Sequence, residues 1–153
     1  MLLEVKNLKV QFDTLMGLSS PVDDISYSLD EGETLGLVGE SGCGKSMSAS
    51  AILRLVPPPG RIVDGEVLLD GADLLKSSGA EMRRVRGHFM SMVLQDPVAS
   101  LNPVFPIGDQ VGEAVTVSQR LRGRSLRERI VELLRMVRIP AAENRIYEYP
   151  HQM

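Results

Sequence analysis

The chain has 153 residues, of which 43% are hydrophobic and 24% are charged, a composition typical of a globular protein with its own core. Its formal net charge of −3 gives no electrostatic reason to expect a nucleic-acid partner. A single cysteine excludes an internal disulfide framework. No apolar run approaches the ~18 residues of a membrane-spanning helix, and the N-terminal residues lack the pattern of a signal peptide.

The first segments of the chain are predicted to be strands. Apolar and polar residues alternate over Leu2–Val10, which is typical of a half-buried strand. A loop is expected over Thr14–Pro21, followed by a second strand over Val22–Leu29 and a turn over Asp30–Glu33. The short apolar run Thr34–Val38 has the length of another strand.

The middle of the chain is predicted to contain one helix and two further strands. Apolar residues recur at helical spacing over Lys45–Val56, and Pro57–Gly60 is expected to stop that helix. Glu66–Leu69 is predicted to be a strand that ends in a turn at residues 70–71. Phe89–Leu94 is a second apolar run of strand length.

The last third of the chain changes character. Gln95–Pro106 contains three prolines and is predicted to be irregular. Helices are expected over Ile107–Leu121 and Leu126–Val137, and Ser125 with Glu128 forms a capping-box pattern for the second. This order of elements predicts an α/β core followed by the beginning of a helical subdomain.

The run GESGCGKS, residues 39–46, carries the clearest chemical signal. Gly39, Gly44, Lys45 and Ser46 match the pattern G-x-x-x-x-G-K-[ST] of a phosphate-binding loop. Glycines let backbone N–H groups point at phosphates, and the N-terminus of the following helix favours an anion. Lys45 places a positive charge near the β- and γ-phosphates, and Ser46 offers a hydroxyl to Mg²⁺.

The loop and its cysteine each have a plainer interpretation. A glycine-rich turn that feeds a helix gives the same local pattern, but chance alone produces such a match in fewer than roughly one chain in a hundred at ordinary glycine content. Cys43 satisfies the loop's need for a small residue, and the alternative for it is a reactive thiol at the helix N-terminus.

Gln95 in VLQDPVASLNP, residues 93–103, is the second candidate. A glutamine that directly follows a buried strand can reach a site beside the phosphate loop if the two strands are near neighbours. Its amide oxygen would then ligate Mg²⁺ or position the attacking water. The alternative is a polar residue that ends a strand before a proline turn.

Taken together, LVGESGCGKS, MVLQDPVASLNP and YEYPHQM, in this order, resemble an ATP-binding-cassette (ABC) transporter ATPase subunit. SLNPVFPIGDQV and the opening LLEVKNLKVQF resemble the branch that serves dipeptide and oligopeptide importers. The resemblance implies an α/β fold: a P-loop NTPase core with N-terminal antiparallel β-strands and the start of a helical subdomain. It places an incomplete nucleotide-binding core at residues 1–98, and the Q-loop with part of the helical subdomain at residues 99–153.

The resemblance also implies roles for individual positions. Phe12 falls where an aromatic ring stacks on adenine, although a core aromatic at a strand end is the plainer alternative. Val22 matches an apolar contact near the ribose and base. Lys45 and Gln95, the Q-loop residue, are expected to take part in catalysis, and Ser46 and Gln95 in holding Mg²⁺. The predicted nucleotide contacts are Phe12, Val22, Gly39, Glu40, Ser41, Gly42, Cys43, Gly44, Lys45, Ser46 and Met47.

One position departs from the family pattern. Met47 stands where many relatives carry a hydroxyl that reaches the α-phosphate. Because a methionine side chain cannot donate a hydrogen bond, we expect that contact to come from the backbone or from Ser48. The arginine-rich stretch Arg120–Arg129 is predicted to be a solvated connection between helices, with docking to membrane subunits as the alternative that the family implies.

The implied function is an ATP-hydrolysing subunit of a dipeptide or oligopeptide importer that uses ATP and Mg²⁺. Its expected partners are transmembrane permease subunits, a second ATPase subunit and, indirectly, a substrate-binding protein, with no nucleic acid. Its expected location is the cytoplasmic face of the cell membrane.

YEYPHQM resembles the run-in to the family signature, so we expect an N-terminal part of a longer ATPase. The alternative is a nucleotide-binding fragment without hydrolytic activity. A GTPase is disfavoured because the sequence contains no N-K-x-D motif.

Overall fold

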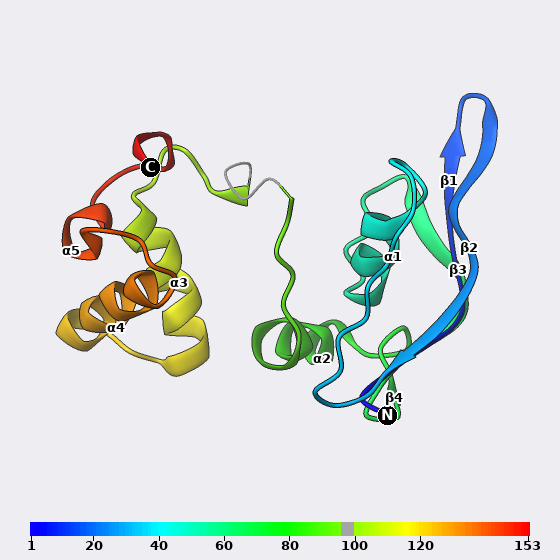
Figure 1. The fold of residues 1–153 in the computed structure, drawn as a ribbon, viewed down its shortest axis with the longest axis horizontal. Helices are drawn as coiled ribbons and strands as arrows, with labels where there is room; N and C mark the ends of the chain where they lie inside the picture. Colours follow the sequence, from blue (N-terminus) through cyan, green and yellow to red (C-terminus); the bar gives the residue numbers. More distant parts are fainter. Residues whose placement is uncertain (96–99) are drawn as a thin grey trace. The chain divides into compact units, whose positions relative to one another are not determined.

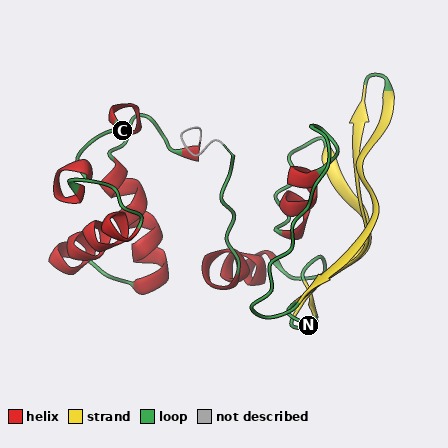
Figure 2. Cartoon of the chain, viewed as in Figure 1, coloured by secondary structure: helices red, strands yellow, loops and turns green. Residues whose placement is uncertain are grey.

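The computed structural model describes residues 1–95 and 100–153. The chain divides into two compact units, Met1–Met90 and Ser91–Met153, and each is described by itself. The first contains the sheet and the first helices, and the second is helical (Figures 1 and 2). Within the described ranges, no helix has both the length and the apolar character needed to cross a membrane.

An antiparallel sheet forms one side of the first unit (Figure 2). Its strands are β1 (Leu3–Thr14), β2 (Gly17–Leu29), β3 (Gly60–Leu69) and β4 (Ala72–Asp73), in the spatial order β2-β1-β3-β4. β1 and β2 form a hairpin, and β3 pairs with the other edge of β1. The predicted strands at the N-terminus are present, and β1, β2 and β3 are each longer than expected.

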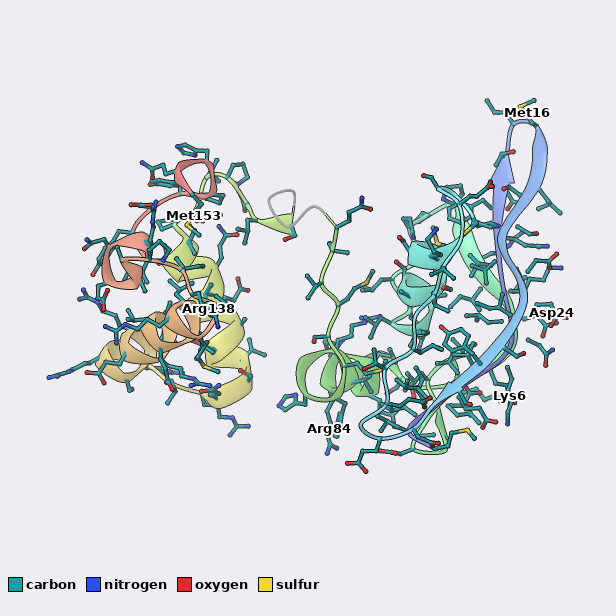
Figure 3. All side chains as sticks on the ribbon, in the orientation of Figure 1. Lys6, Met16, Asp24, Arg84, Arg138 and Met153 are labelled. Atoms are coloured by element: carbon teal, nitrogen blue, oxygen red, sulfur yellow. The ribbon has the colours of Figure 1, made fainter. Side chains whose placement is uncertain are left out.

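The prediction of a loop over Thr14–Pro21 is wrong for most of its length. Only Leu15 and Met16 form the turn, and β2 begins at Gly17. The Thr14 hydroxyl closes the turn because it donates to Gly17 O at 2.6 Å and accepts the Met16 N–H at 3.3 Å. Met16 therefore projects from the tip of the hairpin (Figure 3).

An irregularity in β1 breaks the alternation expected over Leu2–Val10. Val5 and Leu8 are both buried, although they are three residues apart, because the pairing with β2 shifts between them. Asn7 takes a φ of 47° there, and its side-chain amide donates to the Asp24 carboxylate at 2.7 Å. On the other side, Gly65 approaches so closely that an added Cβ would lie 2.6 Å from the Leu8 Cα.

Helix α1 (Lys45–Ile52) packs against this sheet (Figure 1). It ends four residues before the predicted boundary at Val56, since Arg54 takes a left-handed φ of 52°. The Arg86 guanidinium donates to Leu53 O at 2.9 Å and to Arg54 O at 3.0 Å, which satisfies carbonyls at the helix end. The core between helix and sheet is made of Leu3, Val5, Leu8, Val10, Val22, Ala51, Ile52, Val67, Leu74 and Met82.

Two predicted strands are not strands in the described part of the chain. Thr34–Val38 runs without sheet pairing, and residues 90–94 have no regular structure. Phe89 instead ends the π-helix η1 (Val85–Phe89), which continues α2 (Gly79–Arg84). An apolar run supplies strand propensity but not the neighbouring strand that its backbone groups require.

The second unit is built from short helices. These are α3 (Ile107–Gln119), α4 (Gly123–Met136), α5 (Ala142–Arg145) and the 3₁₀ turn η3 (Pro150–Gln152). The two longer helices were predicted to within three residues at each end. Their core consists of Ile107, Ile130, Leu134, Ala142 and Ile146. Of the segment predicted to be irregular, residues 101–106 lie outside helices and strands, and residues 96–99 lie outside the described residues.

The predicted capping box at Ser125 and Glu128 is wrong. Because α4 begins at Gly123, Ser125 already lies inside its first turn, where its hydroxyl donates to Arg122 O at 2.9 Å. A capping box does form at α2, where the Ser78 side chain accepts the Glu81 N–H and the Glu81 carboxylate accepts the Ser78 N–H.

Candidate nucleotide-binding site

The glycine loop lies directly before α1, as the sequence predicts. Gly44 is the N-cap of the helix with a left-handed φ of 90°, and Gly42 has a φ of 84°. A Cβ added to Gly44 would lie 1.9 Å from the Pro21 carbonyl oxygen of β2. Both the backbone conformation and the close approach of β2 therefore require glycine at this position.

The Lys45 side chain folds back over the loop that precedes it. Its ammonium donates to Glu40 O at 2.6 Å and to Gly39 O at 2.8 Å, and it lies 3.3 Å from the Cys43 Sγ. These contacts hold a positive charge on the inner side of the loop. An anion that enters the loop therefore meets the Lys45 charge together with the N-terminus of α1.

The first turn of α1 supplies the backbone donors. Ser48 N donates to Gly44 O at 2.8 Å, so the N–H groups of Lys45, Ser46 and Met47 precede the first closed helical bond and remain available to a ligand. Ser46 is exposed at this end of the helix. Glu40, Ser41, Gly42 and Cys43 are also exposed along the loop.

A cavity of about 520 Å³ lies beside the loop. Its walls come from β2, from the segment before the loop and from the start of α1. The lining residues are Ser20, Pro21, Val22, Asp23, Ile25, Ser26, Tyr27, Leu37, Val38, Cys43, Gly44, Lys45 and Ser48. Asp23 is the one carboxylate among them, and Lys9 Nζ holds it at 2.7 Å.

Val22 and Phe12 have different surroundings. Val22 is 3% exposed, lines the cavity and packs beside Gly44. The Phe12 ring lies over Gly60, where an added Cβ would be 2.4 Å from it, and packs against the core of the sheet. This packing fits the plainer alternative, a core aromatic at a strand end, and adenine stacking by Phe12 stays a prediction.

Neither Met47 nor Ser48 offers a free side-chain donor to the loop. The Met47 side chain packs against the hydrophobic core, and Ser48 is 3% exposed with its hydroxyl donating to Lys45 O at 2.7 Å. Of the two donors expected to replace the missing hydroxyl at position 47, Ser48 is engaged elsewhere. The backbone is the remaining candidate.

Gln95 belongs to the second unit and is exposed. Its predicted contact with the phosphate loop in the first unit therefore stays a prediction. The described residues contain no group of three or more His, Cys, Asp or Glu side chains that could hold a metal ion by themselves. A cation at this loop would need oxygens from the nucleotide as well as the Ser46 hydroxyl.

Pro21 and Tyr27 line the cavity from β2, and the sequence predicts no role for either residue. Both lie in or beside a segment that was predicted only to be strand or loop. No pattern in the sequence links them to residues some twenty positions further along the chain, because the link is made by the packing of α1 on the sheet.

The ABC transporter family model matches residues 22–153. The chain belongs to the ABC transporter family. The match includes the glycine loop, α1 and the whole helical unit. It confirms the resemblance found from the sequence motifs.

Similar ABC proteins support this assignment. The chain is 43% identical to the Oligopeptide transport ATP-binding protein OppD of Bacillus subtilis (strain 168), over 99% of this chain and 42% of OppD. It is 41% identical to the Dipeptide transport ATP-binding protein DppD of the same strain, over 98% of this chain and 45% of DppD. The chain thus spans less than half the length of these relatives.

A solved ABC structure has the same fold. The dimeric ATP-binding cassette MJ0796, in a post-hydrolysis state bound to ADP and Pi, superposes with a TM-score of 0.84 at 22% identity. The match covers 99% of this chain and 62% of the chain of MJ0796. The predicted fold class, an α/β cassette with N-terminal antiparallel strands, is confirmed.

Proposed function

We propose that the chain is the ATP-binding part of an ABC importer subunit that serves dipeptides or oligopeptides. The observation that carries this proposal is the loop itself: left-handed glycines, free N–H groups at the start of α1 and the Lys45 ammonium meet at one place. The names of OppD and DppD support the substrate class. Cycles of ATP binding and hydrolysis would drive the permease subunits.

The residues of the loop fit ATP with Mg²⁺. A Cβ added to Gly44 would meet the Pro21 backbone oxygen at 1.9 Å, so the loop keeps its shape only with glycine there. A Cβ added to Gly39 would meet the Cys43 Sγ at 2.7 Å, the end of a side chain that can rotate. Lys45 would leave the carbonyls it now contacts and hold the β- and γ-phosphates. The Ser46 hydroxyl, and Gln95 in the intact subunit, would ligate Mg²⁺.

The partners follow from the same proposal. A second ATPase subunit would complete the nucleotide site, as the dimeric state of MJ0796 supports. Transmembrane permease subunits would hold the pair at the cytoplasmic face of the membrane, and a substrate-binding protein would act indirectly through them. No nucleic acid is expected.

We do not expect residues 1–153 alone to hydrolyse ATP. Asp23, the one carboxylate on the cavity wall, is held by Lys9 at 2.7 Å. General-base activation of water is worth ~10²–10⁴ in rate, and no free carboxylate of the described cavity lining supplies it. We propose that this chain by itself binds nucleotide weakly and does not turn it over.

The test is a Lys45→Ala substitution in the intact subunit, with Mg-ATP as the ligand. A hydrogen bond to a charged group contributes ~1.5–3 kcal/mol, so we expect affinity to fall by roughly 10- to 150-fold in calorimetry. Lys76→Ala is the matched control, because Lys76 is an exposed lysine bound to Asp73 at 2.8 Å, away from the cavity lining. Equal affinity in wild type and Lys45→Ala would show that Lys45 does not face the phosphates.

A further inference from the structure

The Gln110 side chain makes three hydrogen bonds to one loop of the second unit. Gln110 lies in the first turn of α3. Its Oε1 accepts the Asn102 backbone N–H at 2.8 Å, and its Nε2 donates to Asn102 O and to Phe105 O, each at 2.9 Å. The carboxamide therefore uses both of its N–H donors and its carbonyl acceptor. Because Asn102 offers one donor and one acceptor, the carboxamide fits this loop in one orientation only.

Hydrogen bonds, more than apolar burial, hold the loop between Asn102 and Phe105. Val104 is 69% exposed and Phe105 is 52% exposed, so the loop gains little from packing. Within the loop, Asn102 Oδ1 accepts the Val104 N–H at 3.1 Å, and the Phe105 N–H donates to Asn102 O at 3.3 Å. These bonds close a turn, and the bonds from Gln110 fasten that turn to α3.

The first turn of α3 is itself firmly held. The Ile107 N–H donates to Glu148 O at 2.8 Å, and the Gly108 N–H donates to Ile146 O at 2.9 Å. A Cβ added to Gly108 would lie 2.5 Å from Ile146 O, so the two segments are in close contact. Ile107 and Ile146 both belong to the hydrophobic core of this unit. Gln110 thus ties an exposed loop to a well-packed part of the helical unit.

We propose that Gln110 is a positioning residue that fixes the loop following Gln95, and thereby the place from which Gln95 reaches the nucleotide. Gln95 precedes this loop in the same unit. A segment whose far end is anchored has fewer conformations to lose when it adopts a reactive geometry. The consequence for hydrolysis rests on the proposed function, in which Gln95 ligates Mg²⁺, whereas the effect of Gln110 on loop order does not.

The first measurement needs no nucleotide. Hydrogen–deuterium exchange on the intact subunit follows a peptide that covers residues 101–106 and a reference peptide from α4. Gln110→Met keeps the length of the side chain and removes its three hydrogen bonds. We expect exchange of the loop peptide to speed up by at least about fivefold, which corresponds to the loss of one neutral hydrogen bond, with α4 unchanged. Gln119→Met is the matched control, because Gln119 is exposed at the last residue of the same helix.

Gln110→Glu separates hydrogen-bond donation from the filling of space. Its carboxylate has nearly the same size and can still accept the Asn102 N–H, but it cannot donate to Asn102 O or Phe105 O. At neutral pH its loop peptide should therefore exchange at least as fast as that of Gln110→Met. Exchange like that of the wild type in either variant, or equal acceleration in α4, would overturn the proposal.

ATP hydrolysis by the intact subunit is the second arm. Gln110→Met should lower kcat about fivefold and leave the affinity for Mg-ATP unchanged, because the phosphate loop belongs to the first unit. In a Gln95→Ala background, Gln110→Met should lower kcat no further, since Gln110 acts through Gln95. Additive losses, or an unchanged kcat despite faster loop exchange, would overturn the link between Gln110 and Gln95.

A failure of the proposed function gives a different result. If the wild-type intact subunit does not hydrolyse Mg-ATP, or if Gln95→Ala hydrolyses it as fast as the wild type, the role proposed for Gln95 is wrong, and the link from Gln110 to hydrolysis is wrong with it. The exchange measurement still decides whether Gln110 orders the loop.

Discussion

At the scale of single residues, the phosphate loop depends as much on absent side chains as on the charge of Lys45. A Cβ added to Gly44 would lie 1.9 Å from the Pro21 carbonyl oxygen of β2, and Gly44 has a left-handed φ of 90°. Lys45 meanwhile occupies the loop by donating to two of its carbonyls. A bound phosphate would replace those two contacts with stronger charge-assisted ones.

Cys43 gives a test of the loop at this scale. Its thiol is exposed and lies 3.3 Å from the Lys45 ammonium. We expect a maleimide to modify Cys43 in the free chain and saturating Mg-ATP to slow the modification by about tenfold or more, because bound phosphates would cover the loop. Mass spectrometry with and without nucleotide measures this, and Lys45→Ala serves as the variant in which protection should be lost. Equal labelling in both conditions would place the thiol away from the ligand, or would show that the nucleotide does not bind.

At the scale of elements, the arrangement of β1, β2 and β3 depends on a local irregularity in β1 and not on regular strand alternation. The shift at Asn7 keeps Val5 and Leu8 on the buried face, and Gly65 of β3 closes on the same point with a φ of 100°. The irregularity thereby sets which side chains of the rest of β1, and of the part of β2 that contacts α1, face the buried side of the sheet.

Gly65→Ala should therefore destabilise the first unit. An added Cβ meets the Leu8 Cα and the Lys6 carbonyl oxygen at 2.6 Å, which are backbone atoms that cannot move alone. We expect a loss of ~1–3 kcal/mol beyond that of Gly71→Ala, which is the cost of crowding in a packed core. Gly71 has a φ of 79° with nothing within 4 Å of an added Cβ. Gly71→Ala therefore measures the cost of placing alanine at a positive φ without any crowding. Urea unfolding measures both, and equal losses would rule out the crowding.

The capping box of α2 predicts a dependence on pH. The Ser78 backbone N–H, which donates to the carboxylate, lowers the pKa of Glu81 below its ordinary value of 4.5. A lowered folded-state pKa contributes stability that is present above pH 4.5 and is lost as the pH falls through the folded value. The protection factor of the α2 amides, which is their exchange rate corrected for the intrinsic pH dependence of amide exchange, should thus fall on acidification from pH 5 to pH 3 in the wild type. Glu81→Gln should flatten this response, and Glu31→Gln, an exposed carboxylate in a turn, should not. A wild-type response in Glu81→Gln would contradict the assignment.

At the scale of the whole molecule, two units each carry their own hydrophobic core. Between the sheet and the phosphate loop, Thr34–Val38 lacks sheet pairing and exposes Leu35, Leu37 and Val38, the last at 95%. An extended apolar segment with unpaired backbone groups is a site at which chains associate.

We therefore expect residues 1–153 to self-associate when expressed alone. Light scattering should give a mass that rises with concentration above the 16.8 kDa of one chain. Val38→Lys should lower that mass, because a charge discourages strand pairing at this segment. Leu15→Lys is the control, since Leu15 is fully exposed at the hairpin tip and lies outside Thr34–Val38. A stable wild-type monomer would refute the expectation.

The sequence by itself determined the glycine-rich loop, the helix that follows it, the two long helices of the second unit and the family. In the loop and helices, residues close in sequence supply both the pattern and the structure: the glycines, Lys45 and the start of α1 are adjacent along the chain. Local sequence patterns give wrong predictions where the structure of a segment depends on residues far away in the sequence. Thr34–Val38 has the composition of a strand and no strand beside it, and the Ser125 pattern falls inside a helix whose start is set elsewhere.

Only the tertiary structure decided which residues support the loop. Pro21 and Val22 reach Gly44 because α1 packs on β2, and Tyr27 lines the cavity from the same strand. The irregularity at Asn7 is stabilised by Asp24 and Ser26 across the hairpin. These contacts join residues roughly twenty positions apart. Their free energy depends on burial and on hydrogen-bond geometry, which exist only once the sheet and helix have come together.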